Sequence, residues 1–266
     1  MSRPNLPPSL TLSHEELILL LKLFGARTIP GLPSNPFPGL PEEQVNLLIA
    51  SAERNLRARG LLFVSPEGKI TVERFVLALL GPCAVPEFSC VALRARKGGQ
   101  VDLVYFHAAQ MMTVEHIVSG PGLHTFAALK DRQAMFNRLV AFVNLDGQPL
   151  RQAPAGQVSA GALTQGIQAA VQDNPSVQAI LASGAQGSEF HRSLAEDLSQ
   201  FAATSRVVAI QHTVDGQVTA QNYAFIESTH ALWEFTETGD TEAALVDLKP
   251  VSGGAAKNRL WKIVVG

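Results

Sequence analysis

Hydrophobic residues in the first part of the chain recur with a period of about 3.6, which is typical of amphipathic helices. Ser13 can cap a first helix, and Glu15 and Glu16 lie in its opening turn, where carboxylates favour the helix dipole. Residues 29–41 contain five prolines and two glycines and predict an irregular connector. A second, longer helix is expected from Pro41 to Gly60.

A small ribbon and a further helix are expected after this second helix. Residues 61–64 predict a short strand, residues 66–70 a tight turn with the start of a return strand, and Thr71 a cap for a helix over residues 72–80. The order helix, ribbon, helix is the outline of a winged-helix fragment, and it is also a common packing unit. A DNA-binding regulator therefore remains an alternative, although the last helix is not basic.

From Phe88 the hydrophobic period changes to two, as expected for strands that bury one face. Lys97-Gly98-Gly99-Gln100 predicts the first hairpin turn, and Asp131 caps a helix after the last strand. The strands of this antiparallel meander are expected at residues 88–95, 101–105, 112–118 and 123–129.

The second half of the sequence begins with a polar link at residues 146–156. We place the boundary there, which gives an N-terminal half of residues 1–145 and a C-terminal half of residues 146–266. Strand periodicity returns from Arg206, and Arg259 to Val265 is expected to form a final strand. Helices are expected at residues 160–172, 175–182 and 189–203.

The two halves resemble each other in sequence. When residues 91–106 are aligned with residues 208–223, five positions are identical, and the hairpin turns coincide. The third strands follow in register, with His116 opposite Trp233, and after one inserted residue 127–129 matches 243–245. The sequence therefore predicts an α+β fold in which a helix and a four-stranded antiparallel meander are duplicated with pseudo-twofold symmetry.

The composition of the chain argues against several classes of function. The formal net charge is −2, and 17% of the residues are charged, which lacks the electrostatic signature of a general nucleic-acid binder. We expect no secretory signal peptide and no membrane insertion, because no long apolar run occurs. Cys83 and Cys90 are too few for a disulfide framework and are expected to be buried thiols, which favours the cytoplasm.

Catalytic and metal-binding motifs are absent from the sequence. His107, His116 and His124 lie on neighbouring predicted strands, but no carboxylate or thiol accompanies them at ligand spacing, so we expect surface histidines and no metal. Ser188 and His191 are one turn apart, and helix capping by Ser188 explains the pair better than a nucleophile and its base. We predict no cofactor and no enzyme activity, while an enzyme of unknown reaction stays the second alternative.

The remaining candidates are apolar residues that suit a protein partner. Adjacent methionines next to a strand junction can form an adaptable apolar surface, and the thin apolar stripes of the Ala- and Gln-rich helices can receive a partner helix. A monomer and a homodimer both remain open. The candidate partner-binding residues are Phe106, Met111, Met112, Val171, Val177, Ile180 and Phe190.

The order of elements resembles the EspG family, the cytosolic specificity chaperones of type VII (ESX) secretion. The resemblance rests on the phrases LSHEEL at residues 12–17, AERNLRARGLL at 52–62 and VERFVLALLGP at 72–82, which precede the meander. It implies a pseudo-twofold α/β fold and recognition of helical secretion substrates that are kept soluble until export. No family binding residue can be transferred to this sequence.

Overall fold

The computed structural model describes residues 9–110, 112–120, 122–146, 151–174, 176, 189–212, 217–237, 241 and 244–266. The chain divides into two compact units, each assembled from separate stretches of sequence. Unit 1 contains residues 1–90, 104–135 and 211–219, and unit 2 contains residues 91–103, 136–210 and 220–266. The predicted boundary between residues 145 and 146 lies within unit 2, and we retain it as a proposal about how the sequence repeat is divided.

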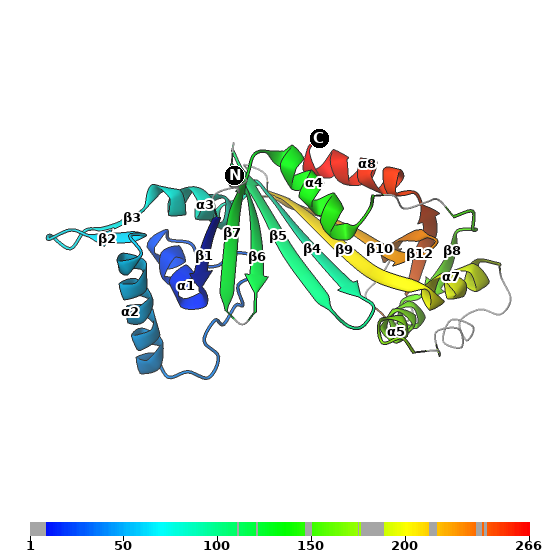
Figure 1. Cartoon of the computed structure of the whole chain (residues 1–266), viewed down its shortest axis with the longest axis horizontal. Helices are drawn as coiled ribbons and strands as arrows, with labels where there is room; N and C mark the ends of the chain where they lie inside the picture. The colour runs from blue at the N-terminus through cyan, green and yellow to red at the C-terminus, as the bar shows by residue number, and fades with distance from the viewer. Residues whose placement is uncertain are drawn as a thin grey trace, which may run out of the picture. The chain divides into compact units, whose positions relative to one another are not determined.

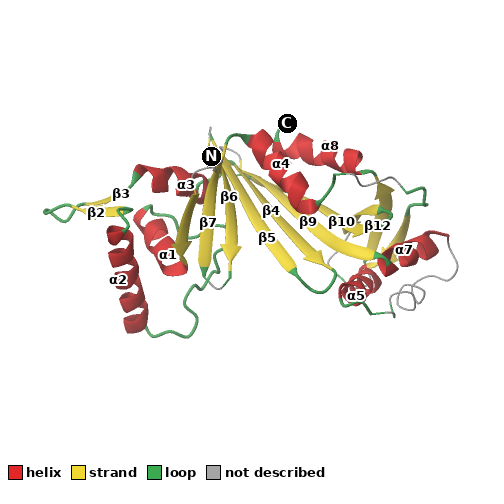
Figure 2. Cartoon of the chain, viewed as in Figure 1, coloured by secondary structure: helices red, strands yellow, loops and turns green. Residues whose placement is uncertain are grey.

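Both units are built from helices and antiparallel strands, so the predicted α+β class is confirmed (Figure 2). The described helices are α1 (His14–Leu23), α2 (Glu42–Ala58), α3 (Arg74–Ala84), α4 (Arg132–Val143), α5 (Ala160–Val171), α7 (Glu189–Ser199) and α8 (Gly253–Val264). The described strands are β1 (Ser9–Ser13), β2 (Leu62–Val64), β3 (Ile70–Val72), β4 (Phe88–Arg96), β5 (Val101–Ala109), β6 (Met112–Ser119), β7 (Leu123–Leu129), β8 (Gly156–Ser159), β9 (Phe201–His212), β10 (Val218–Ser228), β11 (Leu232–Glu237) and β12 (Leu245–Val251).

Unit 1 has the strand order β1-β7-β6-β5-β4, and the helices α1, α2 and α3 belong to it (Figure 1). The registers place Tyr105 opposite His116, His116 opposite Phe126, and Phe126 opposite Leu10, so these four side chains share one face of the sheet. Leu10 and Phe126 pack with buried residues of all three helices in a single core, which therefore covers this face.

The first helix is fixed at its start as the sequence predicts. Ser13 and Glu16 form a capping box, in which each side chain accepts a hydrogen bond from the other residue's backbone N–H. Glu16 also pairs with Arg59, at 2.9 Å, and Arg59 donates a second bond of 2.7 Å to the Thr11 carbonyl. Arg59 thus occupies a carbonyl of the edge strand β1, where an unpaired backbone group would otherwise face water or another chain.

Unit 2 has the strand order β4-β9-β10-β11-β12-β8. Trp233 and Phe235 pack with α5 and α7 in one core, while Glu234 points to the other face and pairs with Arg259 of α8. Alternation along β11 therefore places helices on both faces of this sheet, as Figure 1 shows.

Several sequence predictions for unit 2 were wrong. Arg259 to Val265 is not a strand, because α8 spans Gly253–Val264, and Ser252 caps it by accepting a bond from Ala255 N–H. The helix expected over residues 189–203 ends at Ser199, and β9 begins at Phe201. The helix expected at residues 175–182 lies outside the described residues, apart from residue 176.

The order of elements follows the predicted repeat: α3-β4-β5-β6-β7-α4 is followed later by α7-β9-β10-β11-β12-α8. The match proposed for the fourth strands needs correction. If His116 matches Trp233, then Glu115 matches Leu232, the residue before each. Ala127 lies opposite Glu115 in unit 1, and Val251 lies opposite Leu232 in unit 2. The counterpart of Ala127 is therefore Val251. The earlier pairing failed because the connection before β12 is longer than the one before β7. We keep duplication itself as a proposal.

Candidate protein-binding groove

Helix α3 of unit 1 has one buried face and one exposed face. Glu73 caps it by accepting a bond from the Phe75 N–H, and the buried face contributes Val76, Leu79, Leu80 and Cys83 to the core. On the other side, Leu77 is 43% exposed, and Val85, the residue that follows the helix, is 77% exposed. Leu77 on the helix and Val85 directly after it thus expose two large apolar side chains, which we call the apolar stripe of α3.

This stripe forms one wall of an open groove of about 810 Å³, which we call the α3 groove. Its walls come from α3, from the connection between α3 and β4, from the β5–β6 junction and from the end of β9, all within unit 1. The lining residues are Leu77, Ala78, Gly81, Pro82, Ala84, Val85, Pro86, Glu87, Ala109, Gln110, Met112 and His212. Since nine of these twelve are apolar, the groove suits an apolar ligand surface.

At Gly81 and Pro82 no long side chain projects from the helical wall of the groove. A Cβ added at Gly81 would meet no atom within 4 Å, so a ligand can approach the backbone closely there. Pro82 lies inside α3 and has no N–H, so the Ala78 carbonyl lacks its usual helical donor. The groove therefore combines apolar walls with a helix backbone that is open to close approach at Gly81.

The polar members of the groove are held by backbone hydrogen bonds. Glu87 N–H donates to the Ala108 carbonyl and His212 N–H donates to the Glu87 carbonyl, both at 2.9 Å. Gln110 adopts a left-handed conformation with φ of 52° at the β5–β6 junction. Because these bonds fix the backbone, the exposed Glu87 side chain stands at a defined place on the rim of the groove.

The predicted partner-binding residues that the structure describes divide between the two units. Met112 is half-buried and lines the α3 groove, whereas Phe106 is fully buried. In unit 2, Phe190 is 5% exposed in the core beneath α7, and the half-buried Val171 packs on the same core. Met111, Val177 and Ile180 lie outside the described residues.

Sequence reasoning missed Leu77, Val85 and Pro86 as groove residues. The sequence did contain a signal for this surface. Leu77 is apolar although it lies outside the buried stripe formed by Val76, Leu79 and Leu80, where a polar residue is usual. The walls contributed by the β5–β6 junction and by β9 depend on long-range strand pairing and could not be predicted from local sequence.

Four histidines form a second polar feature of unit 1. His14 Nδ1 lies 3.2 Å from His124 Nε2, and His124 Nδ1 lies 3.0 Å from His116 Nε2. The rings of His116 and His107 are stacked with centroids 6.1 Å apart, and His107 Nδ1 lies 3.2 Å from Ser89 Oγ. We call His14, His124, His116 and His107 the histidine row. The predicted trio does converge, but the expectation of surface histidines was wrong, because all three are at most 1% exposed.

Burial keeps the inner members of the row neutral. It lowers the pKa of His107 to about 4. The pKa of His116 falls to about 2, mainly through burial and further through repulsion from His107 and His124. The pKa of His124 falls to about 4, again mainly through burial and then through His14. The imidazoles are thus arranged to bond with each other in their uncharged form.

Metal and catalytic sites were sought among the described residues. No group of three or more His, Cys, Asp or Glu side chains there is placed to hold a metal ion. Burial raises the pKa of the Cys90 thiol to about 12 and also raises that of Cys83, so neither is a ready nucleophile. Ser188 lies outside the described residues, so its predicted capping role stays a prediction.

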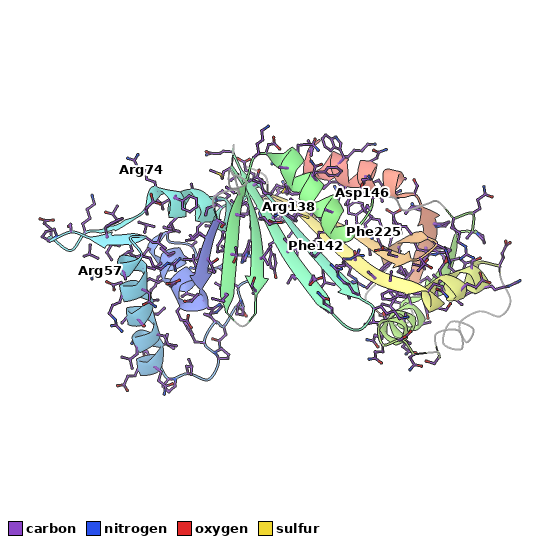
Figure 3. The ribbon with its side chains drawn as sticks, in the orientation of Figure 1. Arg57, Arg74, Arg138, Phe142, Asp146 and Phe225 are labelled. Atoms are coloured by element: carbon purple, nitrogen blue, oxygen red, sulfur yellow. The ribbon has the colours of Figure 1, made fainter. Side chains whose placement is uncertain are left out.

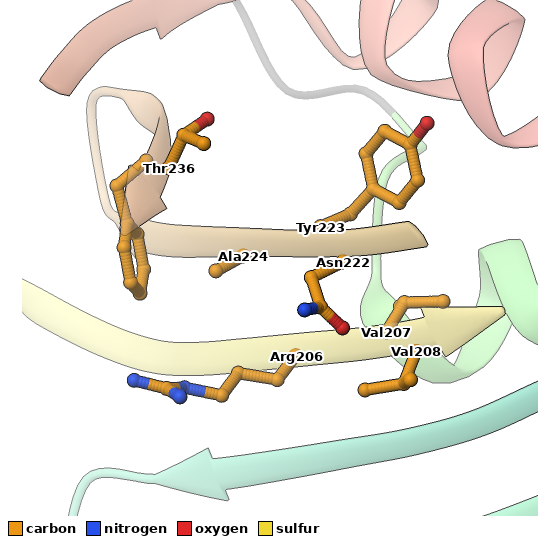
Figure 4. A pocket seen from close by; sticks show the side chains of 8 residues that line it. Arg206, Val207, Val208, Asn222, Tyr223, Ala224 and Thr236 are labelled. Carbon is orange, nitrogen blue, oxygen red and sulfur yellow. The ribbon is translucent and has the colours of Figure 1, made fainter. Parts of the chain in front are cut away.

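Unit 2 contains a smaller cavity of about 340 Å³, bordered by β9, β10 and β11 (Figure 4). The Arg206 guanidinium lies over the Phe235 ring, 5.7 Å from its centroid, and Asn222 and Tyr223 lie on the neighbouring strand. Polar and apolar groups alternate here without a buried acid, base or nucleophile among the lining residues, so the cavity offers no evident chemistry.

Basic side chains of unit 1 do not form a nucleic-acid-binding helix. Arg57 lies on α2, where it pairs with Glu53 at 3.6 Å, and Arg74 lies at the start of α3 (Figure 3). Beyond Arg74, α3 has no Lys or Arg, so the helix in the recognition position of a winged-helix outline lacks phosphate contacts.

No protein family and no curated protein matches the chain by sequence. A solved structure does match: the Mycobacterium tuberculosis type VII secretion system chaperone EspG5, in complex with a PE25–PPE41 dimer. The likeness covers 97% of this chain and 96% of EspG5, with a TM-score of 0.61 and 14% sequence identity. The chain has an EspG-like fold. At this identity the likeness concerns the fold alone, and it confirms the resemblance inferred from the sequence.

The EspG-like fold has no described helix that is both long and apolar enough to cross a membrane. Its α3 groove has a larger volume than the cavity bordered by β9, β10 and β11, and more of its lining residues are apolar.

Proposed function

We propose that this protein is a non-enzymatic chaperone or adaptor of the cytoplasm that binds a helical secretion substrate, and that the α3 groove receives an apolar helix of that partner. The main observation behind this proposal is that Leu77 and Val85 are exposed next to Gly81, where a ligand can approach the backbone closely. Exposed apolar side chains gathered in a groove are one way in which a protein-binding site is built. The similar chaperone EspG5 was solved with a protein dimer bound, which supports a protein partner.

The groove chemistry indicates the kind of helix it would take. Small residues on the partner helix would allow a close approach over Gly81, and larger apolar residues one turn away would contact Leu77 and Val85. A Lys or Arg at the end of that helix would lie near Glu87 on the rim. The proposal is therefore specific for an amphipathic helix with one basic end.

The test is affinity capture with the full chain from lysate of its own cells, followed by mass spectrometry and reconstitution of the captured protein. Val85→Asp and Leu77→Asp place a charge in the groove, and each is expected to reduce capture at least tenfold. Leu47→Asp is the matched control, because Leu47 is 66% exposed on α2, outside the groove.

A helical secretion protein that binds wild type and Leu47→Asp, but neither groove variant, would support the proposal. Equal binding of the partner to all four proteins would show that the groove is not the binding site. Recovery of DNA without protein would favour the alternative of a DNA-binding regulator. Val171 and Met112 remain proposed contacts, and Val171→Asp tests the surface of α5 in the same assay.

A further inference from the structure

The loop between α1 and α2, residues 24–41, contacts the histidine row at two places; we call it the proline-rich loop. Gly31 lies against the sheet so closely that an added Cβ would be 2.8 Å from Tyr105 Cε2 and 3.0 Å from His116 Cε1. Farther along, the Phe37 ring meets the His14 ring edge-on, with centroids 6.1 Å apart. The loop therefore covers the row near its centre and at its outer end.

The loop is held by few bonds. Its backbone hydrogen bonds are local, such as Leu32 N–H to the Ile29 carbonyl at 3.1 Å and Leu40 N–H to the Phe37 carbonyl at 3.3 Å. Ile29 is 2% exposed and anchors the loop in the core. Phe24, Ala26 and Leu32 pack against the same core but stay partly exposed. A segment with one fully buried side chain and no ladder to the sheet can open at a lower free energy than the strands beneath it.

We propose that the histidine row and the proline-rich loop form an acid-sensitive latch: the loop is closed on the neutral row, and protonation of the row in mildly acidic solution releases the loop. Each neutral imidazole has one donor and one acceptor nitrogen, so a row of neutral rings can bond from end to end. A protonated ring has two donors and no acceptor, and charges on two neighbours would repel each other at about 3 Å.

The surroundings of the row offer no counter-ion. Among the described residues no carboxylate is bonded to it: Glu16 of α1 is engaged by Ser13 and Arg59, and Glu115 of β6 occupies an alternate position that points to the opposite face of the sheet. The other groups of adjacent elements are neutral or exposed, namely Ser89 of β4, Tyr105 of β5, Cys83 of α3 and Arg27 of the loop; β1 and β7 add no charged residue.

One atom of the row strengthens this argument. His107 Nε2 is buried and has no hydrogen-bond partner among the described residues. A proton added there would create a buried donor without an acceptor, and hydrating it requires the cover over the row to open. His116 differs, because the Pro30 carbonyl of the loop can accept a hydrogen bond from its ring, so repulsion from the neighbouring rings must outweigh that bond for the loop to open. The latch thus follows from contacts in unit 1 and does not depend on the identity of the proposed partner.

The test is hydrogen exchange of the full chain at pH 7.5 and pH 5.0, corrected for intrinsic exchange, followed in peptides from the proline-rich loop. Loop amides are expected to exchange at least tenfold faster at pH 5.0, while peptides from β11 and β12 change less than threefold. His116→Phe keeps an aromatic ring between Tyr105 and Phe126, whose centroids lie 5.2 and 4.4 Å away, but removes the titrating group. It should reduce the loop response to less than threefold.

His230→Gln is the matched control, because His230 is exposed in unit 2 and should leave the response unchanged. If His116→Phe does not fold, His124→Asn provides the second variant with the same expectation. An unchanged loop at pH 5.0, or an undiminished response in the folded row variant, would overturn the latch. Equal acceleration throughout unit 1 would also overturn it, because acid would then unfold the unit without a separate loop release.

Discussion

His116 in unit 1 and Trp233 in unit 2 occupy matching positions in the proposed repeat, and both are fully buried. Trp233 Nε1 donates to the Asp197 carboxylate at 2.8 Å, and Asp197 also accepts from Ser228 Oγ at 3.3 Å and pairs with Arg151. His116 has a bonded imidazole neighbour and no charged partner. Unit 2 thus buries a charge beside Trp233 and satisfies it, whereas unit 1 surrounds His116 with groups that must stay uncharged.

Because of this difference, we expect the stability of the two units to respond to different changes. Unit 2 depends on each member of a charged network, because an unpaired buried group is costly. The histidine row of unit 1 depends on pH, because its buried rings are stable only in the neutral state. The following four experiments test this contrast, from the largest expected effect to the smallest.

Acidification is expected to have the largest effect and to act through unit 1. The folded pKa of His107, His116 and His124 lies below the ordinary value of 6.5, so the unfolded chain binds more protons, and stability falls as pH falls from about 6.5 toward 4. At pH 5 His107 alone accounts for about 2 kcal/mol, and the other two act in the same direction. Urea unfolding between pH 7.5 and 5.0 measures the loss; a flat profile would contradict it.

Asp197→Ala should destabilise the protein by about 3 kcal/mol, because it leaves Trp233 Nε1 without its buried acceptor and removes the buried ion-pair partner of Arg151. Glu196→Ala is the control: its carboxylate binds the same Arg151 at 2.8 Å but is 56% exposed, so about 0.5 kcal/mol is expected. Equal losses in urea unfolding would show that burial of the network does not matter.

Gly31→Ala should cost about 2 kcal/mol, since φ is 90° and the new Cβ would collide with the Tyr105 ring. Gly39→Ala in the same loop also has a positive φ, of 76°, but meets no atom within 4 Å, so about 1 kcal/mol is expected. The difference between the two unfolding free energies isolates the close contact of the loop with the row. If Gly39→Ala costs as much, the contact contributes nothing.

Val85→Asp should change stability by less than about 0.5 kcal/mol, because the side chain is 77% exposed. The same substitution is expected to prevent partner binding, so thermal unfolding serves as its control. A loss of several kcal/mol would mean that Val85 supports the fold, and its binding defect could not then be assigned to the groove.

Local sequence was sufficient where structure depends on neighbours along the chain. Ser13 with Glu16 predicted the capping box, and the period of two predicted the β7 strand at residues 123–129 with its observed bounds. Strands β1 and β8 were missed because they are short edge strands formed by pairing with distant partners, β7 and β12. The histidine row could not be predicted to be buried, because α1 and the proline-rich loop that cover it come from far earlier in the chain.

The groove was only partly predictable for the same reason. Met112 was singled out for its methionine neighbour, but the exposure of Val85 depends on how α3 packs on the sheet. Phe106 and Phe190 could not be distinguished from surface residues by sequence, because strand and helix patterns show which residues share a face but not which face is covered.

The most direct test of the proposed function is hydrogen exchange of the full chain alone and bound to its captured partner. The account predicts protection of residues 77–87 and of the β5–β6 junction, both of which line the α3 groove, with the exposed end of α2 around Leu47 unchanged. Protection confined to other surfaces, with residues 77–87 exchanging as in the free protein, would contradict the claim that the groove binds the partner.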